Sequence, residues 1–323
     1  MIHCDHKQLD VVQQLRPLLH SVSTEEFSVP NVVVVGMQSH GKSSVLEHAT
    51  GLAFPRGENM CTRVPIVVSV EGGVTEPSLT ISTNPDYSEA WFPEPQYGDQ
   101  AKFGEILMAL TDRLSKPGQI RETPIYVKLR MPNAPTFTIT DVPGVTCNAK
   151  NLNESKALME QTSNLTKKMV GKSPDTLVLL VLSATEDFGN SVAMQVVREL
   201  DPDGTRTIGV VTKIDCVPPN SKIVHNMSGD EIYFYHSYFA VRNRTQEEID
   251  NNLDMSDLDL IEARLFETHP ILSQIPVEQQ GMERLLVKVR EEQSKRLDKC
   301  IPNLRDKIRH RLEETKTQLD MLP

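Results

Sequence analysis

The sequence lacks several features that mark large classes of protein. No apolar run approaches the ~20 residues that a membrane span needs, and the first ten residues lack the basic-then-apolar pattern of a signal peptide. Positive charge is scarce, since 34 Lys+Arg face 44 Asp+Glu and the formal net charge is −10. That surplus of negative charge argues against nucleic acid or anionic lipid as a general partner.

Paired cysteines are also absent. The five cysteines are scattered, without the spacing of a zinc site or a disulfide framework, at Cys4, Cys61, Cys147, Cys216 and Cys300. Together with the missing membrane and leader patterns, this argues against secreted, membrane-spanning and zinc-scaffold proteins. We expect a reducing, cytoplasmic location.

What remains is the composition of a globular protein. Of the 323 residues, 38% are hydrophobic and 24% are charged, which suits a folded chain with a substantial core. The length allows two domains, or one large α/β domain with appendages. The chain shows no internal repeat and no low-complexity segment.

Strand-like and helix-like segments alternate along the chain. Runs rich in β-branched and apolar residues predict strands at 32–35, 65–70, 124–130, 136–141, 176–183, 206–212 and 237–242. Helical spacing predicts helices at about 42–50, 99–115, 153–170, 189–200 and 256–267. Such alternation is typical of an α/β fold with a doubly wound, mostly parallel central sheet.

Two amphipathic segments flank the predicted sheet. Residues 7–22 have helical apolar spacing, although Pro17 should bend or break that helix. Residues 281–321 are charged and helical, interrupted only at Ile301-Pro302. Their apolar stripe consists of Leu285, Leu286, Val289, Leu297, Ile308, Leu312 and Leu319. We expect both segments to pack together outside the sheet domain.

A phosphate-binding loop follows the first predicted strand. Residues 36–43 match G-x-x-x-x-G-K-[ST], with a strand before them and a helix after them. Backbone N–H groups of such a loop surround a triphosphate, helped by the positive end of the helix dipole. Lys42 is expected to reach the β- and γ-phosphates, and the Ser43 hydroxyl to ligate Mg²⁺.

Two later motifs complete a nucleotide site. Residues 212–215 read T-K-I-D after a strand, which places the Asp215 carboxylate where guanine N1 and N2 can donate to it. Adenine has no such donor pair, so the motif favours GTP over ATP. Residues 141–144 read D-V-P-G after another strand, where Asp141 would hold Mg²⁺ through water and Gly144 would sense the γ-phosphate.

Three further motifs resemble the dynamin superfamily of large GTPases. Residues 36–47 (GMQSHGKSSVLE) are similar to its G-x-Q-S-x-G-K-S-S-x-L-E loop. Residues 55–65 (PRGENMCTRVP) resemble its switch I signature, and residues 241–246 (VRNRTQ) resemble its guanine-specificity segment N-R-S-Q, with Thr245 in place of Ser. The resemblance runs from about residue 5 to residue 322.

This resemblance implies a set of functional residues. It implies catalytic roles for Gln38, Ser39, Lys42, Thr62 and Gly144. It implies contacts to GTP or GDP by Ser39, His40, Gly41, Lys42, Ser43, Ser44, Arg56, Gly57, Thr212, Lys213, Asp215, Asn243, Arg244 and Gln246. It implies Mg²⁺ ligation by Ser43, Thr62 and Asp141, and a bound Na⁺ or K⁺ in place of an arginine finger. The Na⁺ or K⁺ would be held by Ser39 and by carbonyls near Gly57 and Asn59.

The resemblance also implies dimerisation of two GTPase domains across the nucleotide face. Asp187, Asn190 and Gln246 would reach toward the partner, and dimerisation would raise turnover and move the flanking helices. Asn59 departs from a Gly of many members, but Asn tolerates a positive φ, so we expect activity to be retained. Pro218 stands where classical members carry an Asp, which counts against that cross-dimer contact. His40 fills a usually small position, and we interpret it as a solvent-facing bystander.

Together these inferences give a domain division and two functional hypotheses. We expect residues 1–27 and 281–323 to form parts of a helical bundle signalling element beside a GTPase domain at 28–280. The first hypothesis is a GTP-hydrolysing, dimerising module coupled to membrane remodelling, with membrane contact only indirect and no nucleic acid partner. The alternative is a GTP-dependent protein-interaction switch with negligible turnover. An ATP-using enzyme is disfavoured by Thr212–Asp215 and Asn243–Gln246. We expect the chain to be a fragment that lacks an oligomerising stalk.

Overall fold

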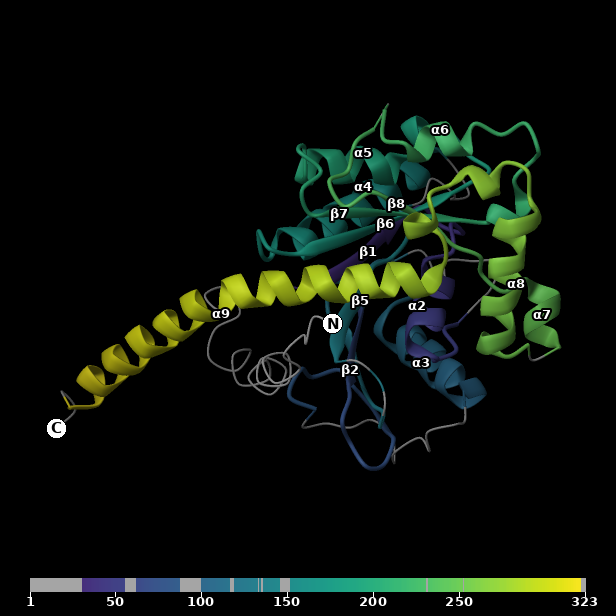
Figure 1. Cartoon of the computed structure of the whole chain (residues 1–323). Coiled ribbons are helices and arrows are strands. Elements are labelled where there is room, and N and C mark those ends of the chain that lie inside the picture. Colours follow the sequence, from purple (N-terminus) through teal and green to yellow (C-terminus); the bar gives the residue numbers. More distant parts are fainter. Residues whose placement is uncertain are drawn as a thin grey trace.

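A computed structural model describes residues 31–55, 62–87, 100–116, 119–132, 134, 136–145, 152–230, 232–251 and 253–320. Its strands are β1 (Val32–Gly36), β2 (Ile66–Glu71), β3 (Ser78–Ser82), β4 (Ile125–Arg130), β5 (Phe137–Asp141), β6 (Leu177–Ser183), β7 (Thr207–Thr212) and β8 (Tyr238–Ala240). Within these ranges they form one eight-stranded sheet in the order β3-β4-β2-β5-β1-β6-β7-β8 (Figure 1).

The sheet is mostly parallel, as the alternating pattern predicts. β1 pairs in parallel with β5 and β6, and β6, β7 and β8 continue in parallel. The pairs β2–β5 and β3–β4 are antiparallel. All seven predicted strands are present, whereas β3 was not predicted. It is a five-residue edge strand in which polar Ser78 and Thr80 alternate with buried Leu79 and Ile81. An alternation this short in the sequence cannot be distinguished from that of a turn.

Helices cover both faces of the sheet (Figure 1). They are α2 (Lys42–Thr50), α3 (Gln100–Leu114), α4 (Leu152–Gly171), α5 (Val192–Leu200), α6 (Ile223–Met227), α7 (Gln246–Asp250), α8 (Met255–Thr268) and α9 (Met282–Asp320). The predicted helix at 189–200 instead starts at Val192, because the Ser191 hydroxyl accepts the Met194 N–H as an N-cap. The short helices α6 and α7 were not predicted.

Alternation along β1 divides the core into two halves. Val32 and Val34 pack with side chains of α2, α3 and α9 on one face. Val33 and Val35 pack with side chains of α4, α5 and α8 on the other. Because both faces are covered, the strand is apolar at every position, and burying each such side chain stabilises the fold by ~1.5–3 kcal/mol.

The last helix differs from its prediction at the proline. α9 is assigned as one continuous helix with Pro302 inside it, so the predicted interruption at Ile301-Pro302 is wrong. Proline removes one intrahelical hydrogen bond and crowds the preceding turn, which bends a helix without necessarily ending it. Figure 1 shows α9 crossing the sheet domain and then turning away from it.

The apolar stripe of α9 is only partly covered. Leu285, Val289 and Leu297 are buried, whereas Leu312 and Leu319 are exposed. The predicted helix at 7–22, which was expected to pack against this stripe, lies outside the described residues. In the part of the chain that the structure describes, no helix is both long enough and apolar enough to cross a bilayer.

Candidate functional site

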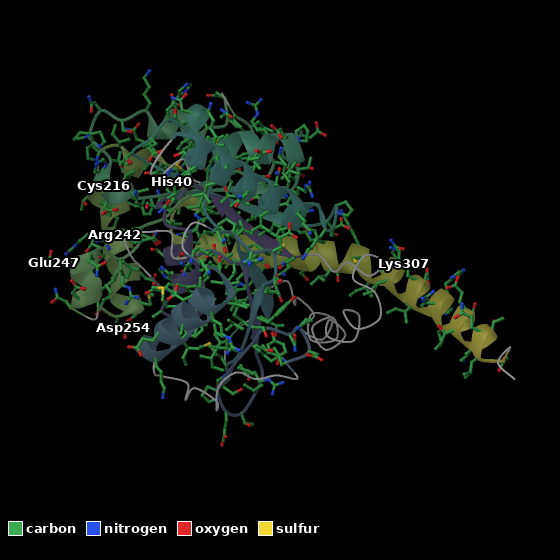
Figure 2. All side chains as sticks on the ribbon, turned by 180° about the vertical axis from the view of Figure 1, so that it is seen from behind. His40, Cys216, Arg242, Glu247, Asp254 and Lys307 are labelled. Carbon is green, nitrogen blue, oxygen red and sulfur yellow. The ribbon has the colours of Figure 1, made fainter. Side chains whose placement is uncertain are left out.

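The carboxyl ends of the parallel strands bring the predicted motifs together. The loop after β1 leads into α2, Asp141 ends β5, Thr212 ends β7 and Asn243 follows β8. In open α/β sheets this edge is where ligands bind. In Figure 2 the labelled His40, Cys216 and Arg242 are seen at the opposite end of the molecule from Lys307 on α9.

The phosphate loop has the left-handed backbone that its sequence suggests. Ser39 and Gly41 have φ values of 65° and 94°. Gly41 is the N-cap of α2, whose N-terminus therefore opens toward the loop. Ser39 is exposed, and Ser43 and Ser44 at the start of α2 are half-buried. Free N–H groups at the N-terminus of α2 are a suitable environment for phosphate.

Lys42 and Asp141 form a buried pair of opposite charges. The Lys42 Nζ donates to the Met37 carbonyl at 3.0 Å. Burial lowers the pKa of the Lys42 ammonium, and the charge of Asp141 opposes that shift. Burial raises the pKa of Asp141 to about 6, and the charge of Lys42 and a hydrogen bond from Thr62 oppose that shift. Burial of two such groups side by side is typical of functional sites.

The Asp141 carboxylate has one oxygen engaged and one free. The Thr62 hydroxyl donates to Asp141 Oδ2 at 3.2 Å, while the buried Oδ1 has no hydrogen-bond partner. Thr62, Asp141 and half-buried Ser43 are oxygen donors of the kind that Mg²⁺ prefers, with phosphate oxygens and water completing its shell. The free Oδ1 is therefore an observation that fits Mg²⁺.

The D-V-P-G segment lies directly against the phosphate loop. The Gln38 N–H donates to the Val145 carbonyl at 3.0 Å, and the Val145 N–H donates to the Gly36 carbonyl at 3.1 Å. A Cβ placed on Gly144 would stand 2.6 Å from Lys42 Nζ. The backbone of Gly144 therefore approaches the position that a γ-phosphate on Lys42 would take.

The predicted base-binding motif is anchored to the phosphate loop. The Thr212 hydroxyl donates to the His40 carbonyl at 2.5 Å and to the Leu182 carbonyl at 3.1 Å. Lys213 has a φ of 57°, and the exposed Asp215 lies in the short 3₁₀ helix Ile214–Cys216 that follows. Asn243 approaches from β8, and its buried Oδ1 has no hydrogen-bond partner. The Cys216 thiol donates to Asp215 Oδ2 at 3.8 Å, so the exposed Asp215 Oδ1 and the Asn243 Oδ1 are the oxygens that a ligand can use.

Three carboxylates hold the segment after β8 (Arg242–Gln246), which we call the guanine segment because the sequence predicts that it contacts guanine. Arg242 Nη2 donates to Glu248 at 2.6 Å, and the Arg242 N–H donates to Glu262 at 2.6 Å. Arg244 pairs with the buried Glu47 of α2 and donates to the Leu253 carbonyl at 3.1 Å. Arg244 therefore fixes the position of this segment through its side chain.

His40 is not the solvent-facing bystander that the sequence suggested. It is 4% exposed, and its Nε2 lies 3.1 Å from the Glu186 carboxylate. Burial lowers the pKa of His40, and Glu186 opposes that shift. The ring fills space between the phosphate loop and the loop after β6, a long-range contact that a local pattern does not reveal.

The residues predicted to face a partner are exposed. Asp187 caps the 3₁₀ helix Phe188–Asn190 by accepting the Gly189 N–H at 2.9 Å. Gln246 donates to Asp250 at 2.8 Å on α7. Their role in dimerisation stays a prediction. Arg56, Gly57 and Asn59, predicted to act near the nucleotide and the monovalent cation, lie outside the described residues.

Four carboxylates of the site were not predicted from the sequence. They are Glu186, Glu248, Glu262 and, in its role as the partner of Arg244, Glu47. Only Glu248 has a local signal. Thr245 and Glu248 form a capping box, in which each side chain accepts the other residue's backbone N–H. The spacing T-x-x-E at 245–248 is the usual signature of that motif.

Comparison with known sequences agrees with the geometry. A sequence model of the dynamin family matches residues 32–214, and one of the dynamin central region matches residues 222–323. The chain is 32% identical over 317 residues to dynamin-related protein 4C of Arabidopsis thaliana, covering 98% of this chain and 44% of that protein. It is 35% identical over 269 residues to putative dynamin-related protein 4A of the same plant, covering 83% of each.

A fungal protein is similar to a comparable degree. Vacuolar protein sorting-associated protein 1 of Schizosaccharomyces pombe is 31% identical over 281 residues, covering 82% of this chain and 41% of that protein. The chain therefore spans less than half the length of two of these three relatives.

Proposed function

The chain belongs to the dynamin family of large GTPases, and from that premise we propose that it binds GTP with Mg²⁺ and hydrolyses it to GDP and phosphate. The observation that carries this proposal is the buried Lys42–Asp141 pair with its unpartnered Asp141 Oδ1. The charges face the phosphate loop, and the hydroxyl of Thr212 joins that loop to the base-binding motif.

Each group has a defined task at the phosphates. Lys42 exchanges its bond to the Met37 carbonyl for phosphate oxygens, whose negative charge compensates the buried ammonium. Bound Mg²⁺ would offset the charge that develops on the phosphate oxygens, and Ser43, Thr62 and Asp141 would hold it. The Gly144 backbone N–H donates to the γ-phosphate, and Gln38 beside it orients the attacking water.

Base selection rests on Asp215 and Asn243. The Asp215 carboxylate accepts two hydrogen bonds from guanine, and Asn243 supplies a further polar contact from the end of the neighbouring strand β8. Adenine would leave the carboxylate unpaired, at a cost of ~1–3 kcal/mol. The dynamin-like loop also implies a monovalent cation at Ser39, which is exposed at the mouth of the site. A dimer through Asp187, Asn190 and Gln246 would complete that site.

Coupling to membranes is a further part of the proposal. Residues 28–280 would form the GTPase domain, and α9 with residues 1–27 would form a lever beside it. The length of α9, 39 residues, and its exposed Leu312 and Leu319 support a lever. The name of the yeast relative, a vacuolar protein sorting-associated protein, is in keeping with a role at membranes.

Nucleotide binding tests the site directly. With a fluorescent GDP analogue and Mg²⁺, we expect displacement by GDP and GTP but not by ADP or ATP. Lys42→Ala should weaken GTP binding ~10–100-fold, as expected for a lost charge-assisted contact, while Lys316→Ala on exposed α9 should leave it unchanged. Asp215→Asn should lose guanine and accept xanthine nucleotides, because the amide donates to the carbonyl at C2 of xanthine. Equal displacement by ATP would contradict the assignment.

Hydrolysis separates the two functional hypotheses. Phosphate release from GTP above that of Lys42→Ala supports the enzyme. Tight binding without release would instead support a GTP-dependent interaction switch.

A further inference from the structure

Glu262 is a buried carboxylate at the junction of three segments. It lies on α8 and is 4% exposed, yet no side chain of opposite charge donates a hydrogen bond to it among the described residues. One of the three segments is α8 itself, another is the guanine segment after β8, and the last is the start of α9. Figure 1 shows the first turns of α9 on the side of the molecule where α7 and α8 lie.

Both oxygens of Glu262 accept backbone N–H groups from the other two segments. Oε1 accepts the Arg242 N–H at 2.6 Å, and Oε2 accepts the Met282 N–H at 3.0 Å. Arg242 directly precedes Asn243 of the base site, and Met282 is the first residue of α9. One rigid group thus fixes the backbone beside the base site and the N-terminus of the long helix.

At Gly281 the backbone lies so close to the Glu262 carboxylate that no side chain fits between them. Gly281 has a φ of 87°, and a Cβ placed there would lie 2.9 Å from Glu262 Oε2. The Gly281 N–H donates to the Ala240 carbonyl at 2.9 Å, so the start of α9 is also bound to the end of β8. Glycine is needed here because its backbone reaches this conformation at little cost.

The burial of Glu262 is energetically unfavourable in itself. Burial raises the pKa of the Glu262 carboxyl to about 7, against the two backbone N–H groups and the charge of Arg242. An apolar side chain of similar volume would fill the space without that cost. An apolar residue, however, could not accept hydrogen bonds from the backbone N–H groups of two segments at once.

We propose that Glu262 is a positioning residue that joins the guanine segment to the first turn of α9, so that ordering of one segment by nucleotide is transmitted to the other. The nucleotide part of this proposal rests on the proposed GTP site. The mechanical part, one carboxylate holding two backbone segments, stands on the structure alone.

Amide hydrogen exchange on the full chain tests the link with Glu262→Gln. Glutamine keeps the size but replaces one acceptor by a donor, which faces a backbone N–H. Without nucleotide, we expect exchange in peptides covering 240–246 and 281–286 to accelerate together by ~10-fold or more, since one of the two backbone hydrogen bonds to this side chain is lost. The matched control is Glu267→Gln on the exposed face of α8, which should change neither.

Adding GDP with Mg²⁺ tests whether ordering of the guanine segment is transmitted to the start of α9. A purely structural role of Glu262 would not change the response to GDP. In the unsubstituted chain GDP should slow exchange in both peptides. In Glu262→Gln it should slow the guanine segment and leave 281–286 unchanged. Equal slowing of 281–286 in both proteins would overturn the proposal. If GDP slows neither peptide in the unsubstituted chain, the proposed GTP site fails, and the ligand-free comparison still decides the mechanical link.

A measurement without substitution covers the case in which Glu262→Gln does not fold. By NMR of the native chain, the Arg242 and Met282 amides should open together, with protection factors within about threefold at every denaturant concentration. Protection factors that differ by more than about tenfold would overturn the proposal.

Discussion

The Arg244 guanidinium pairs with the Glu47 carboxylate of α2, which joins the guanine segment to the helix that follows the phosphate loop. Glu47 is 3% exposed, so removing Arg244 would take an opposite charge away from a buried carboxylate. Arg244 also holds the Leu253 carbonyl at 3.1 Å. The predicted base site and the predicted phosphate site are therefore parts of one polar network.

Loss of Arg244 should destabilise the fold as well as the site. Arg244→Ala should lower the free energy of unfolding by about 3 kcal/mol, the usual cost of breaking a buried ion pair. Denaturant unfolding measures this, with Arg264→Ala on exposed α8 as the control. In a double-mutant cycle with Glu47→Ala, a coupling energy near zero would show that the pair contributes nothing to stability.

Asp141 should make the stability of the nucleotide-free protein fall with rising pH. Its pKa is raised to about 6 in the fold, so between about pH 4 and pH 6 the folded chain holds a proton that the unfolded chain releases. Stability is then fully present below about pH 4 and lost as pH rises through 6, by on the order of 3 kcal/mol. Asp141→Asn should remove this component from the pH profile.

Ligand binding should show the opposite dependence on pH. Mg²⁺ requires the ionised carboxylate, so Mg²⁺-dependent GTP affinity should weaken as pH falls from 7 to 5. Isothermal titration at several pH values measures this. Affinity that is independent of pH over that interval would show that Asp141 does not serve Mg²⁺.

The contact between His40 and Glu186 should control the titration of the histidine. Burial, Lys42 and Lys213 lower the pKa of His40, while Glu186 raises it. Replacing Glu186 by Gln should therefore shift the titration of the His40 ring, followed by NMR, to lower pH. The contribution of His40 to stability should fall as pH drops through 6.5, opposite in sign to that of Asp141, because the folded ring resists protonation. Glu199→Gln, which breaks the pair with Lys167, is the control and should leave the His40 titration unchanged.

Pro302 should set the direction of the last part of α9. Pro302→Ala restores a helical N–H and removes the clash with the preceding turn, which should stabilise the helix by ~3 kcal/mol. Spin labels at positions 288 and 316 should then move apart as the helix straightens. Asn303→Ala is the neighbouring control, and an unchanged label distance in Pro302→Ala would assign the bend to another cause.

The elements that were predictable from sequence carry their signal locally. The run Val32–Val35 is apolar at every position because it is covered on both faces, and the loop after it has a spacing fixed by phosphate geometry. By contrast, β3 is a short edge strand whose alternation resembles a turn. An interruption was predicted at Ile301-Pro302, where the helix in fact continues, because proline can either kink or terminate a helix.

The missed parts of the site depend on contacts between distant residues. His40 meets Glu186 across 146 positions, and Arg244 meets Glu47 across 197 positions. The periodicity of apolar residues along the sequence gives no indication of such pairs. Glu262 lies on an amphipathic helix where a charged residue is ordinarily solvated, so only the fold shows that its carboxylate faces two backbone segments.

Phosphate release by the purified chain with Mg²⁺, measured for GTP and ATP side by side over a range of protein concentrations, is the most direct test of the proposed function. We predict release from GTP alone, with a turnover per molecule that rises with protein concentration and with added K⁺ or Na⁺. Release from GTP no greater than that of Lys42→Ala, or equal release from ATP, would contradict it.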